Sequence, residues 1–311
     1  MTVERKFPVV KIIVFTLMMI IIIVLLIGLR SVPEQASSPG EPFAVLEDQF
    51  DREVTVPEVP GRIVSAAPSN TEILFALGLA EKVAAVTDWC DYPPEVRELE
   101  KIGDIFPINV ERVLSFDPDL VLAHEFSGKE SVMKMEELGV PVLAFKPDSF
   151  ADILESILII GRATGQSAEA EELAAALQEI LDRVEEEGKR IGKHGLKVYA
   201  GEVGGEVLWT SGPGSFLDQA VTLAGGENIA QDLAKSYAQI SMETILEKNP
   251  DVILLISSQD APEKLYTDSL WREIEAVKNR RVFSLDDLYS IPGPRMIEAL
   301  EDLVALLAEC Y

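Results

Sequence analysis

Short apolar runs recur along the chain beyond residue 60, separated by stretches with helical spacing. Eight of these runs have the length and composition of buried strands. They fall at 62–66, 83–87, 120–123, 142–145, 196–202, 207–210, 252–257 and 282–285. Residues up to Val56 resemble a short leading hairpin. Because strands that alternate with helices form parallel sheets, the pattern predicts an α/β fold.

The two sets of four strands are separated by a long segment with helical spacing only. It starts near Ser149, is interrupted between 161 and 165, and resumes after Ser167, a candidate N-cap, with strong helix formers and no proline. This second helix spans about 35 Å at about 1.5 Å per residue, roughly the width of a domain. We therefore expect two Rossmann-like lobes with central parallel sheets, bridged by one long helix that permits only small opening motions.

The first thirty residues predict a membrane anchor. Ile12–Leu29 is an uncharged apolar segment of eighteen residues, and the basic residues Arg5, Lys6 and Lys11 precede it. The positive-inside rule leaves the N-terminus in the cytoplasm and the rest outside. No small-residue cleavage pattern or lipid-attachment cysteine follows, so we expect an uncleaved single-pass anchor in the cell membrane. A poorly marked, cleaved signal peptide is the alternative.

This pattern divides the chain into five parts with different expected roles. We expect a cytoplasmic stub with a transmembrane anchor at 1–30, a linker at 31–45, an N-terminal α/β lobe at 46–148, a bridging helical segment at 149–193 and a C-terminal α/β lobe at 194–311.

Composition narrows the function. The chain of 311 residues carries 53 acidic and 27 basic side chains, a net charge of -26, which argues against binding to nucleic acid. Two cysteines, Cys90 and Cys310, form no disulfide framework, although a bridge between them is formally open. No hydrolase or metal-site motif is present, so we expect no enzyme. The stub is too short for a signalling domain.

An internal repeat connects the two lobes. Both 109–123 and 241–255 combine a short helix, a Pro-Asp turn and an apolar run, and in each a glutamate stands seven residues before the proline. These residues, Glu111 and Glu243, should occupy equivalent surface positions. A lone glutamate in a first helical turn is commonly only a dipole partner. Duplication in register makes a shared functional role the more attractive interpretation.

Four motifs together resemble a known class of proteins. They are RIVSAAPSNTEILFALGL at 62–79, VTDWCDYPPEVRELEKIGD at 86–104, GGENI at 225–229 and IPGPR at 291–295. With the repeated glutamates, they resemble the iron-siderophore, haem and cobalamin class of ABC-importer binding proteins, over about residues 48–311. The DYPPE motif looks most like the cobalamin branch.

The resemblance implies a ligand held between the lobes, and one glutamate per lobe, here Glu111 and Glu243, that docks onto the permease of an importer driven by an ATPase. It also implies a protein without its own cofactor, and we expect a monomer. The chain departs from the family in two respects. Members are commonly lipoproteins or free periplasmic proteins, and Phe106 stands where a tryptophan is expected nearby.

Ligands of α/β sheets bind beyond the carboxyl ends of the strands, which nominates the loops there. These loops and their surroundings supply the candidate ligand-binding residues Trp89, Tyr92, Phe106, His124, Trp209, Tyr289 and Arg295. The set is aromatic, and the loops hold one basic residue, Lys146, with Arg295 nearby. A polyanionic siderophore would need more cations, so the loops favour a corrinoid such as cobalamin. Haem, with His124 as an axial ligand, and a ferric siderophore remain alternatives.

Overall fold

The computed structural model describes residues 41–311 except 204–206, 257–260 and 286–289. Contacts divide the chain between Glu41 and Pro42, and residues 42–311 form one compact unit. The expected anchor at 1–30 and most of the expected linker lie outside the described residues. Within the described part, no helix is both long and apolar enough to cross a membrane.

The first sheet contains five parallel strands in the order β5-β4-β3-β6-β7. Their bounds are β3 (Ile63–Ser65), β4 (Val83–Val86), β5 (Glu100–Lys101), β6 (Leu120–His124) and β7 (Val142–Phe145). The helices around this sheet are α2 (Pro68–Ala76), α3 (Val110–Leu114) and α4 (Lys129–Glu137). The antiparallel hairpin of β1 (Ala44–Glu47) and β2 (Glu53–Val56) precedes it, as expected, although β1 already starts within the expected linker.

The second sheet has the order β11-β9-β8-β12-β13, with β10 beside β8. Its strands are β8 (Lys197–Gly201), β9 (Leu208–Ser211), β10 (Glu227–Asn228), β11 (Tyr237–Ile240), β12 (Val252–Ile256) and β13 (Val282–Leu285). The expected parallel arrangement holds for β10, β8, β12 and β13, whereas β9 is antiparallel to both β8 and β11. The connection from β8 to β9 is too short for the helical crossover that parallel neighbours need.

The helices that accompany the second sheet come from its connections and from the end of the chain. They are α7 (Phe216–Leu223), α8 (Met242–Lys248), α9 (Ala261–Thr267), α10 (Glu275–Lys278), α11 (Pro294–Glu298) and α12 (Leu300–Ala308). We call residues 42–148 the first half of the unit and residues 194–311 the second half. The expected lobe boundaries fall inside one contact unit, and they stay a prediction.

Two antiparallel helices connect the halves, α5 (Phe150–Thr164) and α6 (Ser167–Ile191). Ser149 caps α5 by accepting a hydrogen bond from the Asp152 amide, and Gly165 ends it in the left-handed conformation. The cap predicted at Ser167 is wrong. Only Gln166 separates the left-handed Gly165 from α6, so Ser167 is already the first helical residue.

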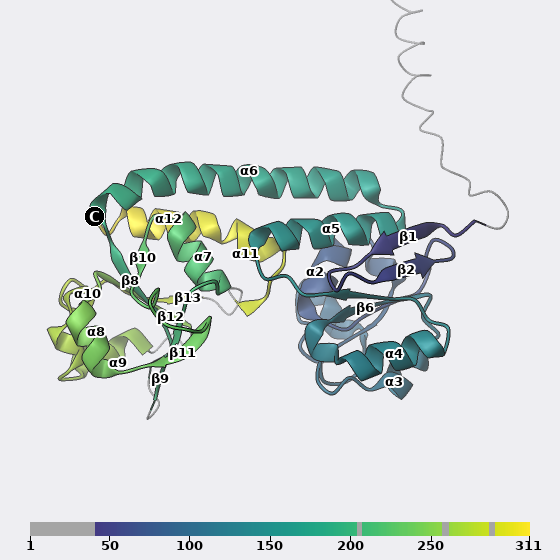
Figure 1. The fold of residues 1–311 in the computed structure, drawn as a ribbon, viewed down its shortest axis with the longest axis horizontal. Coiled ribbons are helices and arrows are strands. Elements are labelled where there is room, and N and C mark those ends of the chain that lie inside the picture. The colour runs from purple at the N-terminus through teal and green to yellow at the C-terminus, as the bar shows by residue number, and fades with distance from the viewer. Residues whose placement is uncertain (1–40, 204–206, 257–260, 286–289) are drawn as a thin grey trace, which may run out of the picture. The chain divides into compact units, whose positions relative to one another are not determined.

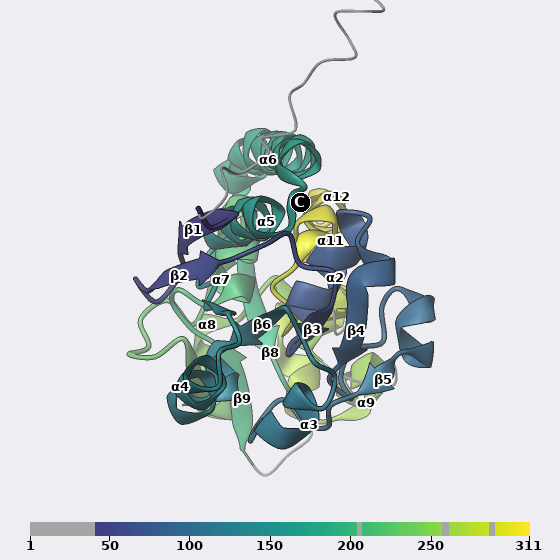
Figure 2. The same ribbon diagram turned by 90° about the vertical axis from the view of Figure 1, so that its right-hand side faces the viewer.

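The long helix α6 packs against its bridging partner α5 and against three helices of the second half, α7, α11 and α12. Figures 1 and 2 both show it lying over α5 and α12. Its buried residues follow an alternating spacing of four and three: Ala170, Ala174, Leu177, Leu181, Val184, Gly188 and Ile191. At Gly188 a Cβ atom would lie 2.0 Å from the Leu223 carbonyl oxygen, so α6 approaches the end of α7 more closely than a side chain allows.

The buried core is divided into clusters, and the division stiffens the connection between the two halves. One buried cluster runs through both halves and includes Leu74, Leu177, Leu217 and Leu300. The opposite face of the first sheet has its own cluster, and so does that of the second sheet. Because the shared cluster lies along the bridging helices, large movements between the halves would expose apolar surface.

Candidate functional site

The carboxyl edge of the first sheet faces the second half. In the loop after β7, the Asp148 carbonyl oxygen accepts a hydrogen bond from the Gln219 side chain of α7, at 2.7 Å. Beside it, the rings of Phe150 and Phe216 lie 5.7 Å apart. The region beyond these strand ends, where the sequence places the ligand, is therefore bounded by both halves.

Two aromatic side chains of the first half protrude strongly into solvent. Trp89, after β4, is 63% exposed, and Phe106, after β5, is 65% exposed. The Trp89 ring is nevertheless held, because its Nε1 donates to Asp104 Oδ1 at 2.9 Å. Hydrogen bonds from Trp89 and from the Ile105 amide keep the pKa of Asp104 below its usual range. Trp89 is therefore an exposed ring with a fixed orientation.

His124, which the sequence nominated as a candidate ligand contact, has a different environment from the one expected. It is buried, and its Nδ1 accepts from the Phe126 amide, so it caps the short turn after β6. Burial lowers the pKa of His124 to about 4, which Asp148 only partly opposes. Phe126 instead is 57% exposed and packs on the imidazole with centroids 4.9 Å apart. His124 as a ligand contact stays a prediction, and Phe126 is the more accessible group.

Trp209, at the start of β9, has an aromatic partner that sequence reasoning missed. The Tyr237 ring of β11 stacks on it at 5.1 Å with an angle of 8° between the planes. The Tyr237 hydroxyl donates to Glu202 Oε1 at 2.7 Å. Burial, together with this carboxylate, raises the pKa of Tyr237 to about 12. Twenty-seven residues separate the two rings, so no hairpin signal marked β11 in the sequence.

Tyr92 and Arg295 come together where the halves meet. The Arg295 guanidinium carbon lies 3.6 Å from the centre of the Tyr92 ring. Its Nη2 donates to Glu72 Oε1 of α2 at 2.5 Å. Burial raises the pKa of Glu72, and Arg295 opposes this shift. Burial alone would lower the pKa of Arg295, but its interactions with Glu72 raise it.

These residues line a groove of about 490 Å³, which we call the joint groove. It is lined by Glu72, Phe75, Ala76, Ala80, Tyr92, Pro93, Glu95, Leu173, Pro294, Arg295 and Glu298. The groove thus brings together two of the predicted ligand-binding residues, one from each half. Tyr289, the remaining member of the predicted aromatic set, lies outside the described residues.

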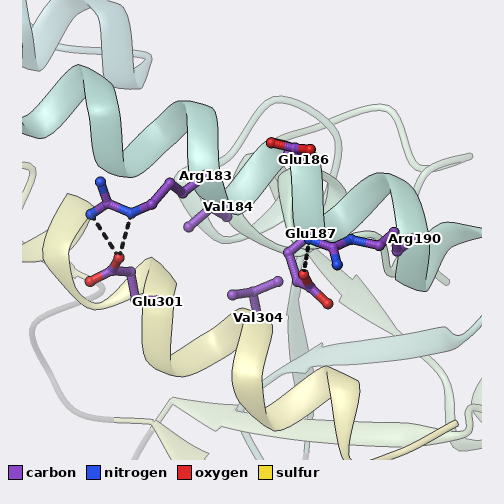
Figure 3. Close-up of a pocket in the computed structure, with 7 residues that line it drawn as sticks. All are labelled: Arg183, Val184, Glu186, Glu187, Arg190, Glu301 and Val304. Carbon is purple, nitrogen blue, oxygen red and sulfur yellow. Dashed lines mark hydrogen bonds and ion pairs between the residues drawn. The ribbon is translucent and has the colours of Figure 1, made fainter.

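A second groove, of about 480 Å³, lies between α6 and α12 (Figure 3). Charged side chains dominate it. Arg183 pairs with Glu301 at 2.9 Å, and Arg190 pairs with Glu187 within α6. These ion pairs are exposed and stabilise little. None of the predicted site residues that the structure describes lines this groove, which lies where α6 packs against α12.

The described residues contain no group of three or more His, Cys, Asp or Glu side chains able to hold a metal ion. Cys90 and Cys310 are both buried as free thiols, so the formally open bridge is not formed. The Cys90 thiol packs beside the hydroxyls of Thr71 and Thr87, and burial raises its pKa. It therefore has the character of a core residue.

The repeated motif folds the same way in each half. Asn109 caps α3 by accepting from the Arg112 amide, and Ser241 caps α8 by accepting from the Thr244 amide. The residues before the two prolines, Asp117 and Asn249, both have positive φ, at 51° and 45°. The motif thus repeats down to its backbone conformation.

The Pro-Asp part of the motif has a structural role that explains its duplication. The Asp119 carboxylate accepts from the backbone N–H of Arg62 at the entry to β3, at 2.9 Å. The Asp251 carboxylate accepts likewise from Lys197 at the start of β8, at 2.9 Å. Within the described part of the chain, the two repeated glutamates have no such contact in common. Glu111 and Glu243 are both exposed in first helical turns, at matching positions.

Known proteins resemble the chain over most of its length. It is 37% identical over 276 residues to YvrC of Bacillus subtilis, described as an uncharacterized ABC transporter substrate-binding lipoprotein, covering 86% of this chain and 87% of that one. It is 30% identical over 250 residues to a vitamin B12-binding protein of Pectobacterium carotovorum, covering 80% of this chain and 89% of that one.

Solved structures agree with these relatives. The periplasmic haem-binding protein RhuT from Roseiflexus sp. RS-1 has a TM-score of 0.72 at 30% identity, covering 80% of this chain and 98% of that one. The periplasmic vitamin B12-binding protein BtuF of Vibrio cholerae has a TM-score of 0.70 at 27% identity, covering 81% and 98%. Residues 63–289 match the family described as periplasmic binding protein. The resemblance predicted from the motifs is thereby confirmed. Members of this family bind substrates for transport and are not enzymes. The chain belongs to this family of substrate-binding proteins of ABC importers.

Proposed function

We propose that this substrate-binding protein captures a corrinoid, with cobalamin as the first candidate, between its two halves and delivers it to an ABC importer permease. The observation that carries the proposal is the exposed aromatic surface at the strand ends. Trp89, Phe106 and Phe126 come from the first half, and the stacked Trp209–Tyr237 pair comes from the second.

Aromatic rings suit a large ligand with a flat macrocycle. Each ring buries about 150–250 Å² on contact, worth about 4–6 kcal/mol at most at about 25 cal/mol/Å². Association and ordering cost about 4–15 kcal/mol, so several rings must act together to give micromolar affinity. The stacked rings of Trp209 and Tyr237 are held parallel, and the Tyr237 side is 45% exposed, so the pair offers aromatic surface for such a contact.

Charge supports a corrinoid over a polyanionic chelate. Arg295, the one predicted contact with a positive charge, is already paired with Glu72 in the joint groove. Lys146 lies 3.4 Å from Asp148. A catecholate or carboxylate siderophore would lack free cations at these positions, whereas a macrocycle edged with carboxamides does not require them.

The described functions of relatives favour the same ligand. Vitamin B12-binding proteins stand among the sequence relatives and among the solved structures of the same fold. Haem is the competing ligand, because RhuT is described as haem-binding and is 30% identical. His124 offers haem little as an axial ligand, since its Nδ1 is occupied and the side chain is buried.

We propose that Glu111 of the first half and Glu243 of the second half dock onto basic residues of the permease.

We also propose that residues 12–29 stay attached as an anchor, which keeps the binding protein close to its permease and raises the effective concentration. Mass spectrometry of the mature chain should then find the N-terminal segment intact. A mature N-terminus beyond residue 29 would contradict the anchor.

The aromatic contact is tested by two tryptophan variants. Trp209→Ala should weaken cyanocobalamin binding at least about thirtyfold, because it removes one ring of the stacked pair. Trp271→Phe is the matched control, since Trp271 is 8% exposed within the core of the second sheet. Equal affinities of Trp209→Ala and the wild-type protein, measured by calorimetry, would overturn this contact.

A further inference from the structure

The ion pair between Glu72 and Arg295 ties α2 of the first half to α11 of the second. The Glu72 side chain is 4% exposed and that of Arg295 is 24% exposed, so the carboxylate is enclosed and the guanidinium reaches the groove surface. The Tyr92 ring lies against the guanidinium on one face. Arg295 is thereby held in one place by a buried anion and an aromatic ring.

The backbone at Gly293 makes room for this carboxylate. A Cβ atom at residue 293 would lie 3.0 Å from Glu72 Oε2, so a side chain there would press on the pair. Glu72 Oε2 and Arg295 Nε are both buried without a hydrogen-bond partner among the described residues. The contact therefore depends on one charged hydrogen bond, with most of the guanidinium donors left for other partners.

The surroundings of the pair are acidic. Glu95 and Glu298 are exposed and line the joint groove together with Glu72, whereas Arg295 is the only basic side chain among the described residues that line it. Because Glu72 cancels the charge of Arg295, the groove presents a net negative field to a ligand. A ligand carboxylate would have to displace Glu72 and would be repelled by its neighbours.

We propose that Glu72 is a positioning residue that sets the charge preference of the ligand site: by holding and neutralising Arg295, it selects ligands with an uncharged carboxamide edge over ligands with carboxylates. The inference rests on the proposed function, in which Tyr92 and Arg295 contact the ligand. A carboxamide oxygen accepts from the remaining guanidinium N–H groups without displacing Glu72. The selection acts through Arg295, so it disappears when Arg295 is replaced.

The test compares two probes that differ by one charge. Cyanocobalamin and its monocarboxylic acid, in which one propionamide is hydrolysed, are titrated against the full-length protein in detergent micelles. The wild-type protein should bind the acid more weakly, and this difference should shrink at high salt. The relevant ratio is the dissociation constant of the acid divided by that of cyanocobalamin. Glu72→Gln should lower this ratio by about tenfold, mainly because the acid binds more tightly.

Two further variants separate positioning from structure. Glu137→Gln removes one exposed charge on α4, away from the joint groove, and should leave the ratio within about twofold of wild type, because an exposed carboxylate is screened by solvent. In an Arg295→Gln background, Glu72→Gln should no longer change the ratio, since the group it acts through is absent. A purely structural Glu72 would weaken both probes alike in either background.

The outcomes are distinct from those for the proposed function. Equal wild-type affinities for both probes at low salt would overturn the inference while leaving corrinoid capture intact, even if Glu72→Gln fails to fold. An unchanged ratio in a folded Glu72→Gln protein would do the same. If the protein binds haem instead, haem and its neutral dimethyl ester replace the probes. Binding of neither pair would overturn both claims.

Discussion

His124 follows β6 directly, and its environment decides its chemistry. The imidazole is enclosed, and its Nδ1 accepts from the Phe126 amide, so the neutral ring serves as a cap. A histidine after a strand looks like a ligand in the sequence, because burial is invisible there. The pKa near 4 is the physical mark of the difference, since the protonated form would need water that the site excludes.

The depressed pKa of His124 predicts a pH dependence of stability. The folded pKa of about 4 lies below the ordinary value of 6.5, so the contribution is present above pH 6.5 and is lost as pH falls through 4. Between pH 7 and pH 4 the wild-type protein should lose about 3 kcal/mol more of its unfolding free energy than His124→Asn. The asparagine keeps a side-chain acceptor but does not titrate.

Urea unfolding of both proteins at the two pH values measures this difference. The many carboxylates that titrate over the same range are common to both proteins and cancel in the comparison. Identical losses for the two proteins would mean that folding leaves the pKa of His124 at its ordinary value, which would contradict its lowering by burial.

At the scale of elements, periodic patterns in the sequence predicted the helices and strands well. They did not predict which distant strands pair. The eight predicted strands are confirmed within one residue at each end, because continuous apolar runs mark them. The repeat predicted matching helices, and α3 and α8 match in caps and turns. The edge strand β11 was missed, since residues 237–240 alternate little and their partner β9 is distant in sequence.

The candidate site could be predicted only in part, for the same reason. Loop aromatics such as Trp89 and Phe106 were nominated as ligand contacts because they follow strands or their extensions. Both rings are exposed, and their contact with a ligand stays a prediction. The stacking of Tyr237 on Trp209 and the pairing of Glu72 with Arg295 join residues 28 and 223 positions apart. Contacts of this kind depend on how the elements pack, which periodicity does not encode.

The matched helices α3 and α8 carry the docking prediction. Glu111→Arg combined with Glu243→Arg should leave the ligand dissociation constant unchanged and lower uptake at least about tenfold, because two attractive contacts become repulsive. Both side chains are exposed, so folding should be unaffected. Uptake of labelled ligand into cells or proteoliposomes with the permease is the measurement.

A control with the same change in net charge accompanies this variant. Glu137→Arg combined with Glu179→Arg reverses two exposed glutamates on α4 and α6, away from the repeat. It should transport normally. Normal uptake by the Glu111 and Glu243 double variant, or equal loss in the control, would remove the basis for docking through these residues.

At the scale of the whole molecule, the packing of residues 42–311 limits the movement of the two halves relative to each other. Its shared core runs along α5 and α6, and contacts at Asp148–Gln219 and Glu72–Arg295 join the halves at two places. A ligand between the halves would therefore meet a largely preformed surface of rings. Preorganisation of this kind lowers the ordering cost of binding.

The most direct measurement is an equilibrium titration of the full-length protein with cyanocobalamin, followed through the corrin absorbance and by calorimetry. We expect one saturable site with a dissociation constant below about 10 μM, and no comparable site for haem or a ferric catecholate. Absence of saturable binding up to about 100 μM would contradict it, as would a tight haem complex with a new Soret band that cyanocobalamin fails to displace.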